Sequence, residues 1–197
     1  MQREQGGAVW AAPWGLGPAA MALAGPCARA GLRLVVAAGA APAPTPSLAL
    51  RFPAGEPAAL AVARSAILDR MGRLDGLLFV LPAPLDAALP AADALQPIAA
   101  LDALRAGLGP SLPWVLVLPD ASGARSGSAA ALALQGAAFG LARASQAAGQ
   151  RADVCLLPRG VWQGAALHGR AALRFAWAIE GGPLPWMAAR VRRGSRA

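Results

Sequence analysis

The chain has 197 residues and a formal net charge of +8, and it is 56% hydrophobic but only 14% charged. It contains no tyrosine, lysine or asparagine, so mechanisms that need a phenol, an ε-amine or an asparagine amide are excluded. This length suits one domain covering residues 1–197. A lone globule of this size cannot readily bury so much apolar surface, so the composition points to a partner or a membrane contact.

The charge pattern and the two cysteines indicate a protein of the reducing cytoplasm. All 18 basic residues are arginine, spread along the chain with one cluster at Arg190–Arg196. No basic stripe is interleaved with aromatic residues, so we expect no nucleic-acid partner. Cys27 and Cys155 lack metal-ligand spacing and are interpreted as small buried hydrophobic residues rather than a disulfide.

The uncharged stretch Gln5–Ala28 is similar in composition to a signal peptide or a membrane span. Glu4 lies where a signal peptide carries positive charge, and proline and glycine interrupt the apolar run. We therefore expect a strand, a glycine turn and a helix here, and no transmembrane segment.

Short apolar runs alternate with longer helix-like segments, a pattern typical of a parallel sheet built from βαβ units. The predicted strands are Ala8–Ala12, Leu32–Ala38, Ser47–Phe52, Gly76–Leu81, Trp114–Leu118, Asp153–Leu157 and Met187–Arg192. The predicted helices are Pro18–Ala30, Pro57–Met71, Asp86–Gly107, Ser128–Gly149 and Gly164–Ile179. Ala40–Pro46 is a short connector, and the fold class is α/β with a mostly parallel seven-stranded sheet and helices on both faces.

The predicted helix Ser128–Gly149 has an unusual composition. Between Ala129 and Ala142 its one polar side chain is Gln135. A helix that is apolar all round is buried on more than one side. One side can cover the sheet, and we expect the other to contact a second molecule. The alternative is an alanine-rich surface that tolerates exposure.

Three segments carry a resemblance to a known family. They are Met71–Leu77 (MGRLDGL), Gln135–Arg143 (QGAAFGLAR) and Val154–Gly160 (VCLLPRG). Their order and spacing after a glycine-rich first turn resemble the short-chain dehydrogenase/reductase family over nearly the whole chain. The resemblance implies a doubly wound, Rossmann-like fold and a family activity of NAD(P)-dependent oxidoreduction.

In that family the first strand leads into a TGxxxGxG turn that receives the cofactor pyrophosphate. Gly15 and Gly17 match two of these glycines, so they are the candidate cofactor-binding residues, as a vestigial turn. Ala11 stands at the first glycine and Trp14 crowds the turn, which obstructs close approach of the cofactor. A structural role of both glycines in the turn is favoured.

The other positions at which the family holds the dinucleotide are also changed. The second strand ends in residues 37–40 (AAGA), which offer no acidic or basic side chain for the ribose. Arg51-Phe52-Pro53 stands where the family places Asp-Val, and Phe79–Pro82 stands at its NNAG motif. We therefore expect no NAD or NADP cofactor.

The catalytic groups implied by the resemblance are missing. Gln135 stands at the family's lysine, Ala131 at its tyrosine and Pro119-Asp120 at its Ser-Ser, with Ser122 nearby. Loss of one such acid–base group typically costs ~10²–10⁴-fold in rate, so no catalytic residue is expected. The chain is also short after Gly160, where the family carries a substrate lid, so a shortened C-terminal lid is predicted.

A few residues are left as candidates for a site. His168 is the only histidine, so no His–His metal pair exists and a surface or packing role is favoured. Asp120 and Ser122 follow a central strand, where open α/β sheets bind ligands, although an ordinary polar turn has the same pattern. The tryptophans are interpreted as core or interface anchors: Trp114, Trp162, Trp177 and Trp186.

The sequence thus predicts a non-catalytic subunit that acts as a structural or accessory partner in a homo- or hetero-oligomer. The resemblance implies contacts through helices 86–107 and 128–149 with an active short-chain dehydrogenase or a larger complex, and a second interface through Arg170–Ile179 and Met187–Arg192. One alternative is an unconventional NAD(P)-dependent oxidoreductase that uses Asp120, Ser122 or His168. Another is a structural component of a larger, membrane-associated complex that binds through its arginine-rich end.

Overall fold

The computed structural model describes residues 7–38, 46–53, 56–81, 90, 92–121 and 129–180. The strands are β1 (Val9–Ala12), β2 (Arg33–Ala37), β3 (Pro46–Leu50), β4 (Gly76–Val80), β5 (Trp114–Pro119) and β6 (Ala152–Leu157). The α-helices are α1 (Ala20–Arg29), α2 (Pro57–Met71), α3 (Gln96–Leu108), α4 (Ala129–Ala147) and α5 (Gly169–Glu180). Three 3₁₀ turns complete the described elements: η1 (Gly17–Ala19), η2 (Asp93–Leu95) and η3 (Arg159–Gln163).

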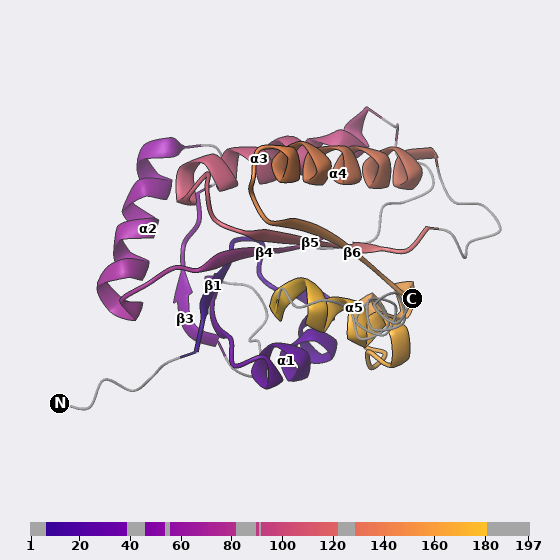
Figure 1. Ribbon diagram of the computed structural model, residues 1–197, viewed down its shortest axis with the longest axis horizontal. Coiled ribbons are helices and arrows are strands. Elements are labelled where there is room, and N and C mark those ends of the chain that lie inside the picture. The colour runs from indigo at the N-terminus through magenta and orange to yellow at the C-terminus, as the bar shows by residue number, and fades with distance from the viewer. Residues whose placement is uncertain are drawn as a thin grey trace, which may run out of the picture.

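The strands form one parallel sheet in the order β3-β2-β1-β4-β5-β6. The direction of strand progression reverses between β1 and β4, which is the topological switch point of a Rossmann-like fold. Helices cover both faces of the sheet, with α3 and α4 on one side and α1 and α5 on the other (Figure 1). The fold is therefore α/β and Rossmann-like, as the sequence predicts.

Each face of the sheet has its own apolar core, because side chains of a strand alternate between the two faces. Leu78, Val80 and Val117 pack on the side of α1 and α5. Leu77 and Phe79 pack on the side of α2, α3 and α4. Every residue of β4 and β5 is buried, which explains why these strands have continuous apolar runs in the sequence.

The seam between β1 and β4 is held by groups from distant parts of the chain. The Val9 N–H donates to Oδ2 of Asp75 at an N···O distance of 2.8 Å, and the Asp75 N–H donates to the Val9 carbonyl at 2.7 Å. Arg73 holds the same carboxylate through Oδ1. Gly76 lies opposite Trp10, and a Cβ at Gly76 would come within 2.6 Å of the indole ring. A glycine is therefore required there.

The predicted element boundaries are mostly confirmed. The first six predicted strands are present with ends within two residues, and Pro57–Met71 is a helix over the predicted range. The predicted seventh strand, Met187–Arg192, lies outside the described residues, as do Trp186 and Arg190–Arg196. The sheet has six strands over the part of the chain that the structure describes.

Two predicted helices begin too early. The helix predicted over Asp86–Gly107 begins at Gln96, after the 3₁₀ turn η2, and residues 86–89 and 91 are not among those described. Pro97 accounts for the start, because proline suits the first turn of a helix and breaks its interior. The helix predicted from Gly164 begins at Gly169, because Gly164 adopts a left-handed φ of 86° that ends η3.

Among the described helices, none is long and apolar enough to cross a membrane.

Candidate functional site

The first turn of the fold, between β1 and α1, contains the two glycines predicted as a vestigial cofactor turn. Gly15 and Gly17 have positive φ angles of 69° and 50°, which side chains rarely tolerate. The Gly15 N–H donates to the Ala12 carbonyl at 2.8 Å, so it helps to close the turn. Both glycines are thus required by the backbone itself, whether or not a phosphate binds.

An aromatic pair lies at the switch point between β1 and β4. Trp14, in the turn after β1, packs edge-on against Phe79 of β4, with ring centroids 5.3 Å apart and an interplanar angle of 66°. Phe79 is fully buried, and Leu16 beside the turn is buried as well. Among the described residues, apolar side chains therefore occupy the part of the switch point that lies between the first turn and β4.

The carboxyl end of β5 is tied to the neighbouring elements. The side-chain amide of Gln135 donates from Nε2 to the Pro119 carbonyl at 2.9 Å, which joins α4 to β5. The Asp120 N–H donates to the Leu157 carbonyl at 2.7 Å, which joins β5 to β6. The hollow between Leu81, Ala131 and Gln135 has a volume of only about 10 Å³, room for one water molecule at most.

Trp162 closes the same end of the sheet from its other face. It lies in η3, directly after β6, and its side chain is buried in the core on the side of α1 and α5. Its indole Nε1–H donates to the Leu81 carbonyl, just past the end of β4, at 2.7 Å. The sequence predicts an anchoring role for this tryptophan but gives no sign of its partner, because the two residues are 81 positions apart.

The remaining candidates from the sequence are placed as follows. Asp120 is half-buried at the end of β5, and Ser122 lies outside the described residues. His168 is exposed before the first turn of α5, and its carbonyl accepts a hydrogen bond from Ala172 N–H. No group of three or more His, Cys, Asp or Glu side chains that could hold a metal ion is present within the described ranges.

Both cysteines are buried free thiols, as predicted. Burial raises the pKa of Cys27 from its ordinary value of 9.0 to about 12. Burial likewise raises the pKa of Cys155 from 9.0 to about 12, although Arg174 lowers it slightly. Both groups are therefore neutral near pH 7 and are not activated nucleophiles.

The fold is that of several solved short-chain dehydrogenases/reductases. A putative member from Burkholderia xenovorans is 17% identical over 95% of this chain and 81% of its own, with a TM-score of 0.52. The enoyl-acyl carrier protein reductase of Bacillus cereus, in complex with NADP+ and indole naphthyridinone, is 14% identical over 88% and 81%, with a TM-score of 0.50. A variant of a Serratia marcescens short-chain dehydrogenase/reductase is 16% identical over 91% and 90%, also with a TM-score of 0.50.

No family model and no curated protein sequence matches the chain. At these identities the structural likeness establishes the fold and not the activity.

The hydrogen bond from Trp162 predicts a stability difference between two otherwise similar variants. Trp162→Phe leaves the buried Leu81 carbonyl without its donor, so we expect the free energy of unfolding in urea to fall by about 1–3 kcal/mol from this loss alone. Trp114→Phe is the matched control, because the buried Nε1 of Trp114 makes no hydrogen bond within the part of the chain that the structure describes. Equal losses in the two variants would contradict a stabilising role of the Trp162 bond.

The raised cysteine pKa values predict a loss of stability in alkali. The thiols titrate near pH 9 when unfolded but near pH 12 when folded, so their contribution is complete below pH 9 and is lost as pH rises toward 12. No lysine or tyrosine side chain titrates in this window. Urea unfolding between pH 8 and 11 should show a falling stability, and Cys27→Ala or Cys155→Ala should each remove about half of that slope. A slope unchanged in both variants would refute this assignment.

Proposed function

We propose that this chain is a non-catalytic subunit with a short-chain-dehydrogenase-like fold, which acts as a structural or accessory partner in an oligomer. The observation that carries the proposal is an exposed apolar face on α4, at the side of the helix that does not contact the sheet. The filled carboxyl end of the sheet supports the non-catalytic half of the proposal.

The exposed face of α4 is a single stripe along the helix. Leu132 is 54% exposed and Phe139 is 44% exposed, and they are seven positions apart, so they lie on the same side of the helix. Gly136 and Gly140 lie between and beside them and are exposed too. The opposite side, which includes Leu134 and Ala138, is buried against the sheet.

No other described helix combines these features. Helix α2 also has two large exposed apolar side chains, Val62 and Leu68, but their spacing of six positions places them about 120° apart around the helix. Charged residues lie between and beside them, namely Arg64 and Asp69, both exposed. The stripe on α4 contains no charge before Arg143, which favours contact with another protein surface.

Neither contacts nor backbone conformation within the described chain require glycine at the two glycine positions of the stripe. A Cβ at Gly136 or Gly140 would meet no atom within 4 Å, and neither residue has a positive φ. Glycine inside a helix costs about 1 kcal/mol relative to alanine. Packing of a second helix against α4 would explain why glycine is present here, because the absence of a side chain lets two helix backbones come near each other.

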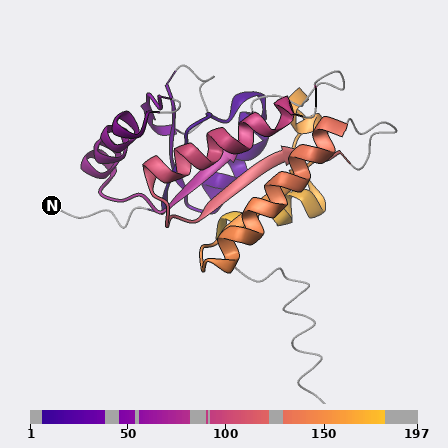
Figure 2. The ribbon, with the colours of Figure 1, turned by 90° about the horizontal axis from the view of Figure 1, so that it is seen from above.

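The position of α4 supports a partner of the same general fold. Helices α3 and α4 lie over the same face of the sheet (Figure 2). In the family that the sequence resembles, the corresponding helices of two subunits pack into a four-helix bundle. An active short-chain dehydrogenase, a second copy of this chain, or a larger complex could each supply the opposing pair.

The chain's chemistry supports the absence of catalysis. The amide of Gln135, at the position of the family's lysine, is engaged by the Pro119 carbonyl, and Ala131 at the position of its tyrosine carries only a methyl group. The connection from β6 to α5 consists of η3 and residues 164–168, which is short for a substrate lid. Gly15 and Gly17 serve the turn, so no cofactor is required to explain them.

The non-catalytic half of the proposal predicts no cofactor binding. Trp14 and Phe79 occupy the switch point, so NAD+, NADP+ and their reduced forms at millimolar concentration should leave the melting temperature unchanged. A ligand at a hundred times its dissociation constant would add about 2.7 kcal/mol of stability, which a thermal melt resolves. A saturable upward shift would revive the oxidoreductase alternative, and turnover by the chain alone would establish it.

The proposed role in an oligomer predicts that a glycine-to-alanine substitution in the stripe stabilises the folded chain but weakens its association with a partner. Gly136→Ala and Gly140→Ala should each raise the stability of the isolated chain by up to about 1 kcal/mol through helix propensity. The added methyl groups should nevertheless weaken the assembly, measured by native mass spectrometry and by sedimentation over a dilution series. We expect a loss of about tenfold or more in affinity from each.

Gly25→Ala in α1 is the control for these variants. Gly25 is an exposed helical glycine whose added Cβ would only touch Arg29 at 3.4 Å, so it should change stability without changing association. If the wild-type chain is a monomer that captures no partner from its own host, or if the α4 variants associate as the wild type does, the proposed interface is wrong.

A further inference from the structure

The sheet ends at β6, and the outer edge of this strand has no strand partner among the described residues. Helices α4 and α5 both contact β6, one on each face of the sheet (Figure 1). A hollow of about 310 Å³ lies between Phe139 of α4, residues 153–156 of β6, and Arg174 and Trp177 of α5. Side chains of a strand alternate between the two faces, so a hollow that touches consecutive residues lies along the edge of the strand.

The hydrogen bonds to β5 show which residues of β6 face this edge. The Trp114 N–H donates to the Arg151 carbonyl at 3.1 Å, and the Asp120 N–H donates to the Leu157 carbonyl at 2.7 Å. Alternate residues of a strand bond to the same neighbour, so the odd-numbered residues of β6 face β5. The even-numbered residues therefore direct their N–H and C=O groups outward.

Two of the outward residues are open. The carbonyl of Ala152, the first of them, already accepts from Nε2 of Gln146 at 2.6 Å. Val154 and Leu156 come next, and their backbone groups make no hydrogen bond to any part of the chain that the structure describes. The open stretch of the edge is thus short and begins at a defined point.

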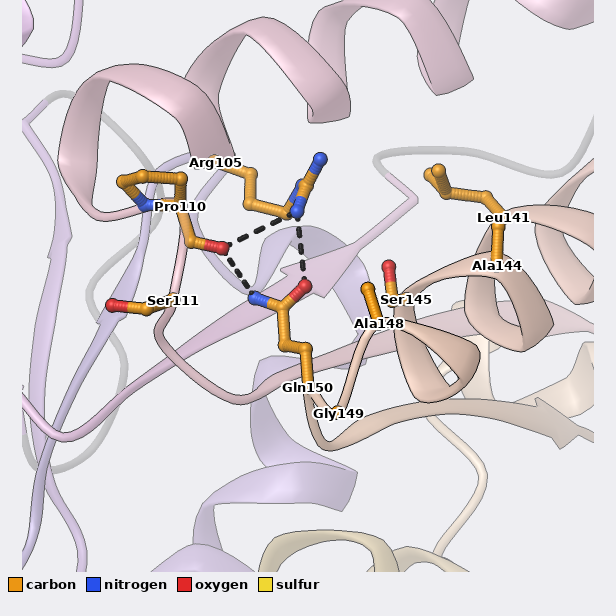
Figure 3. Close-up of a pocket in the computed structure, with 9 residues that line it drawn as sticks. All are labelled: Arg105, Pro110, Ser111, Leu141, Ala144, Ser145, Ala148, Gly149 and Gln150. Atoms are coloured by element: carbon orange, nitrogen blue, oxygen red, sulfur yellow. Dashed lines mark hydrogen bonds between the residues drawn. The ribbon is translucent and has the colours of Figure 1, made fainter.

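The start of β6 and the end of α5 are held in place by side chains. Arg105 donates from Nη1 to Oε1 of Gln150 at 2.9 Å, and Gln150 donates from Nε2 to the Pro110 carbonyl at 2.8 Å (Figure 3). Arg151 donates to the Ala178 carbonyl, which joins the last turn of α5 to the start of the strand. A preorganised edge of this kind loses little conformational entropy when another strand binds.

The edge lacks the usual protection against pairing. Soluble proteins commonly place lysine, proline or a bulge on edge strands, because open backbone groups invite another strand. The residues of β6 (ADVCLL) include no lysine or proline, and their register with β5 is regular. The half-buried Asp153 has a long ion pair with Arg151, at 4.0 Å. The buried indole N–H of Trp177 makes no hydrogen bond within the described ranges, so polar groups beside the edge are incompletely paired.

The open groups select one arrangement of two identical strands. A two-fold axis pairs them antiparallel, and an axis at Cys155 sets Val154 of each copy opposite Leu156 of the other. Each of these pairs then exchanges two hydrogen bonds. An axis at Val154 would instead set Leu156 against Ala152, whose carbonyl is already bonded. An axis at Leu156 would set Val154 against Pro158, which has no N–H.

The axis at Cys155 also brings complementary groups together. Asp153 and Arg174 both act electrostatically on the Cys155 thiol, so both lie near it. Arg174 makes no ion pair with the described residues, and the axis carries it toward Asp153 of the other copy. Phe139 lines the hollow and belongs to the exposed stripe of α4, so the strand edge and the stripe form one continuous surface.

We propose that the edge of β6 binds a second copy of this chain, with the two strands antiparallel about a two-fold axis at Cys155. The two sheets then join into one, with α4 of both copies on one face and α5 of both copies on the other. This inference rests on the proposed function in that both require an oligomer, and it names the partner as an identical chain.

Sedimentation of the full chain over a dilution series tests the inference, and we expect a dimer. Val154→Pro removes an outward N–H from each copy but no bond to β5, so this variant should keep the wild-type circular dichroism and dimerise about tenfold more weakly or worse. Ala49→Pro is the matched control on the opposite edge strand, β3. Ala49 is exposed and faces away from β2, because the neighbouring Leu50 carbonyl bonds to the Ala38 N–H. Its dimerisation should equal that of the wild type.

Amide hydrogen exchange of the wild-type chain provides a measurement that needs no variant. The amides of Val154 and Leu156 should exchange faster as the protein is diluted, whereas the Cys155 amide, which faces β5, should not change. Exchange of Val154 and Leu156 that is independent of concentration overturns the inference. If both amides are protected at every concentration, the chain's own remaining residues cover the edge.

The outcomes also separate this inference from the proposed contact of α4. A dimer that survives Val154→Pro but is weakened by Gly140→Ala overturns the pairing of β6 and leaves the α4 interface standing. A chain that is monomeric alone yet joins a different protein through α4 does the same. A dimer weakened by Val154→Pro and unchanged by Gly140→Ala supports the pairing of β6 and contradicts the proposed role of the α4 glycines.

Discussion

The central strands of this fold are buried on both faces, and the packing of every helix depends on this constraint. A sheet of this kind meets its surroundings only at the ends of its strands. Among the described residues, three contacts lie at the carboxyl ends: Trp14 on Phe79, Gln135 on the Pro119 carbonyl, and Trp162 on the Leu81 carbonyl. These contacts join β4 and β5 to the first turn, to α4 and to η3 at the end where open α/β sheets accept ligands.

The exposed face of α4 is the other notable feature of the molecule. A chain with 56% hydrophobic residues and a filled crevice still leaves Leu132 and Phe139 in solvent, beside two glycines that nothing in the described chain requires. The features that fit an interface therefore lie on a helix whose other face stabilises the sheet. Gln135 belongs to the same helix and holds the end of β5.

The sequence was a good guide to the fold and a poor guide to the contacts at the carboxyl end of the sheet. Apolar runs such as Gly76–Val80 report burial on two faces directly, and the αL glycine at Gly72 marks the end of α2. Helix starts at Gln96 and Gly169 were misplaced because alanine-rich segments look helical on either side of a proline or glycine. The bond from Trp162 to the Leu81 carbonyl depends on a tertiary neighbour, which local composition does not encode.

The seam between β1 and β4 has a consequence for synthesis on the ribosome. Val9 and Asp75, which join the two strands, are 66 residues apart, whereas β1 and β2 are separated by a much shorter segment that contains η1 and α1. Translation proceeds at roughly 5–20 residues per second, so β1 waits for seconds with one edge and the indole of Trp10 uncovered. Closing so long a loop is also entropically costly. Until β4 is made, the edge of β1 that will pair with it is free to pair with a strand of another chain.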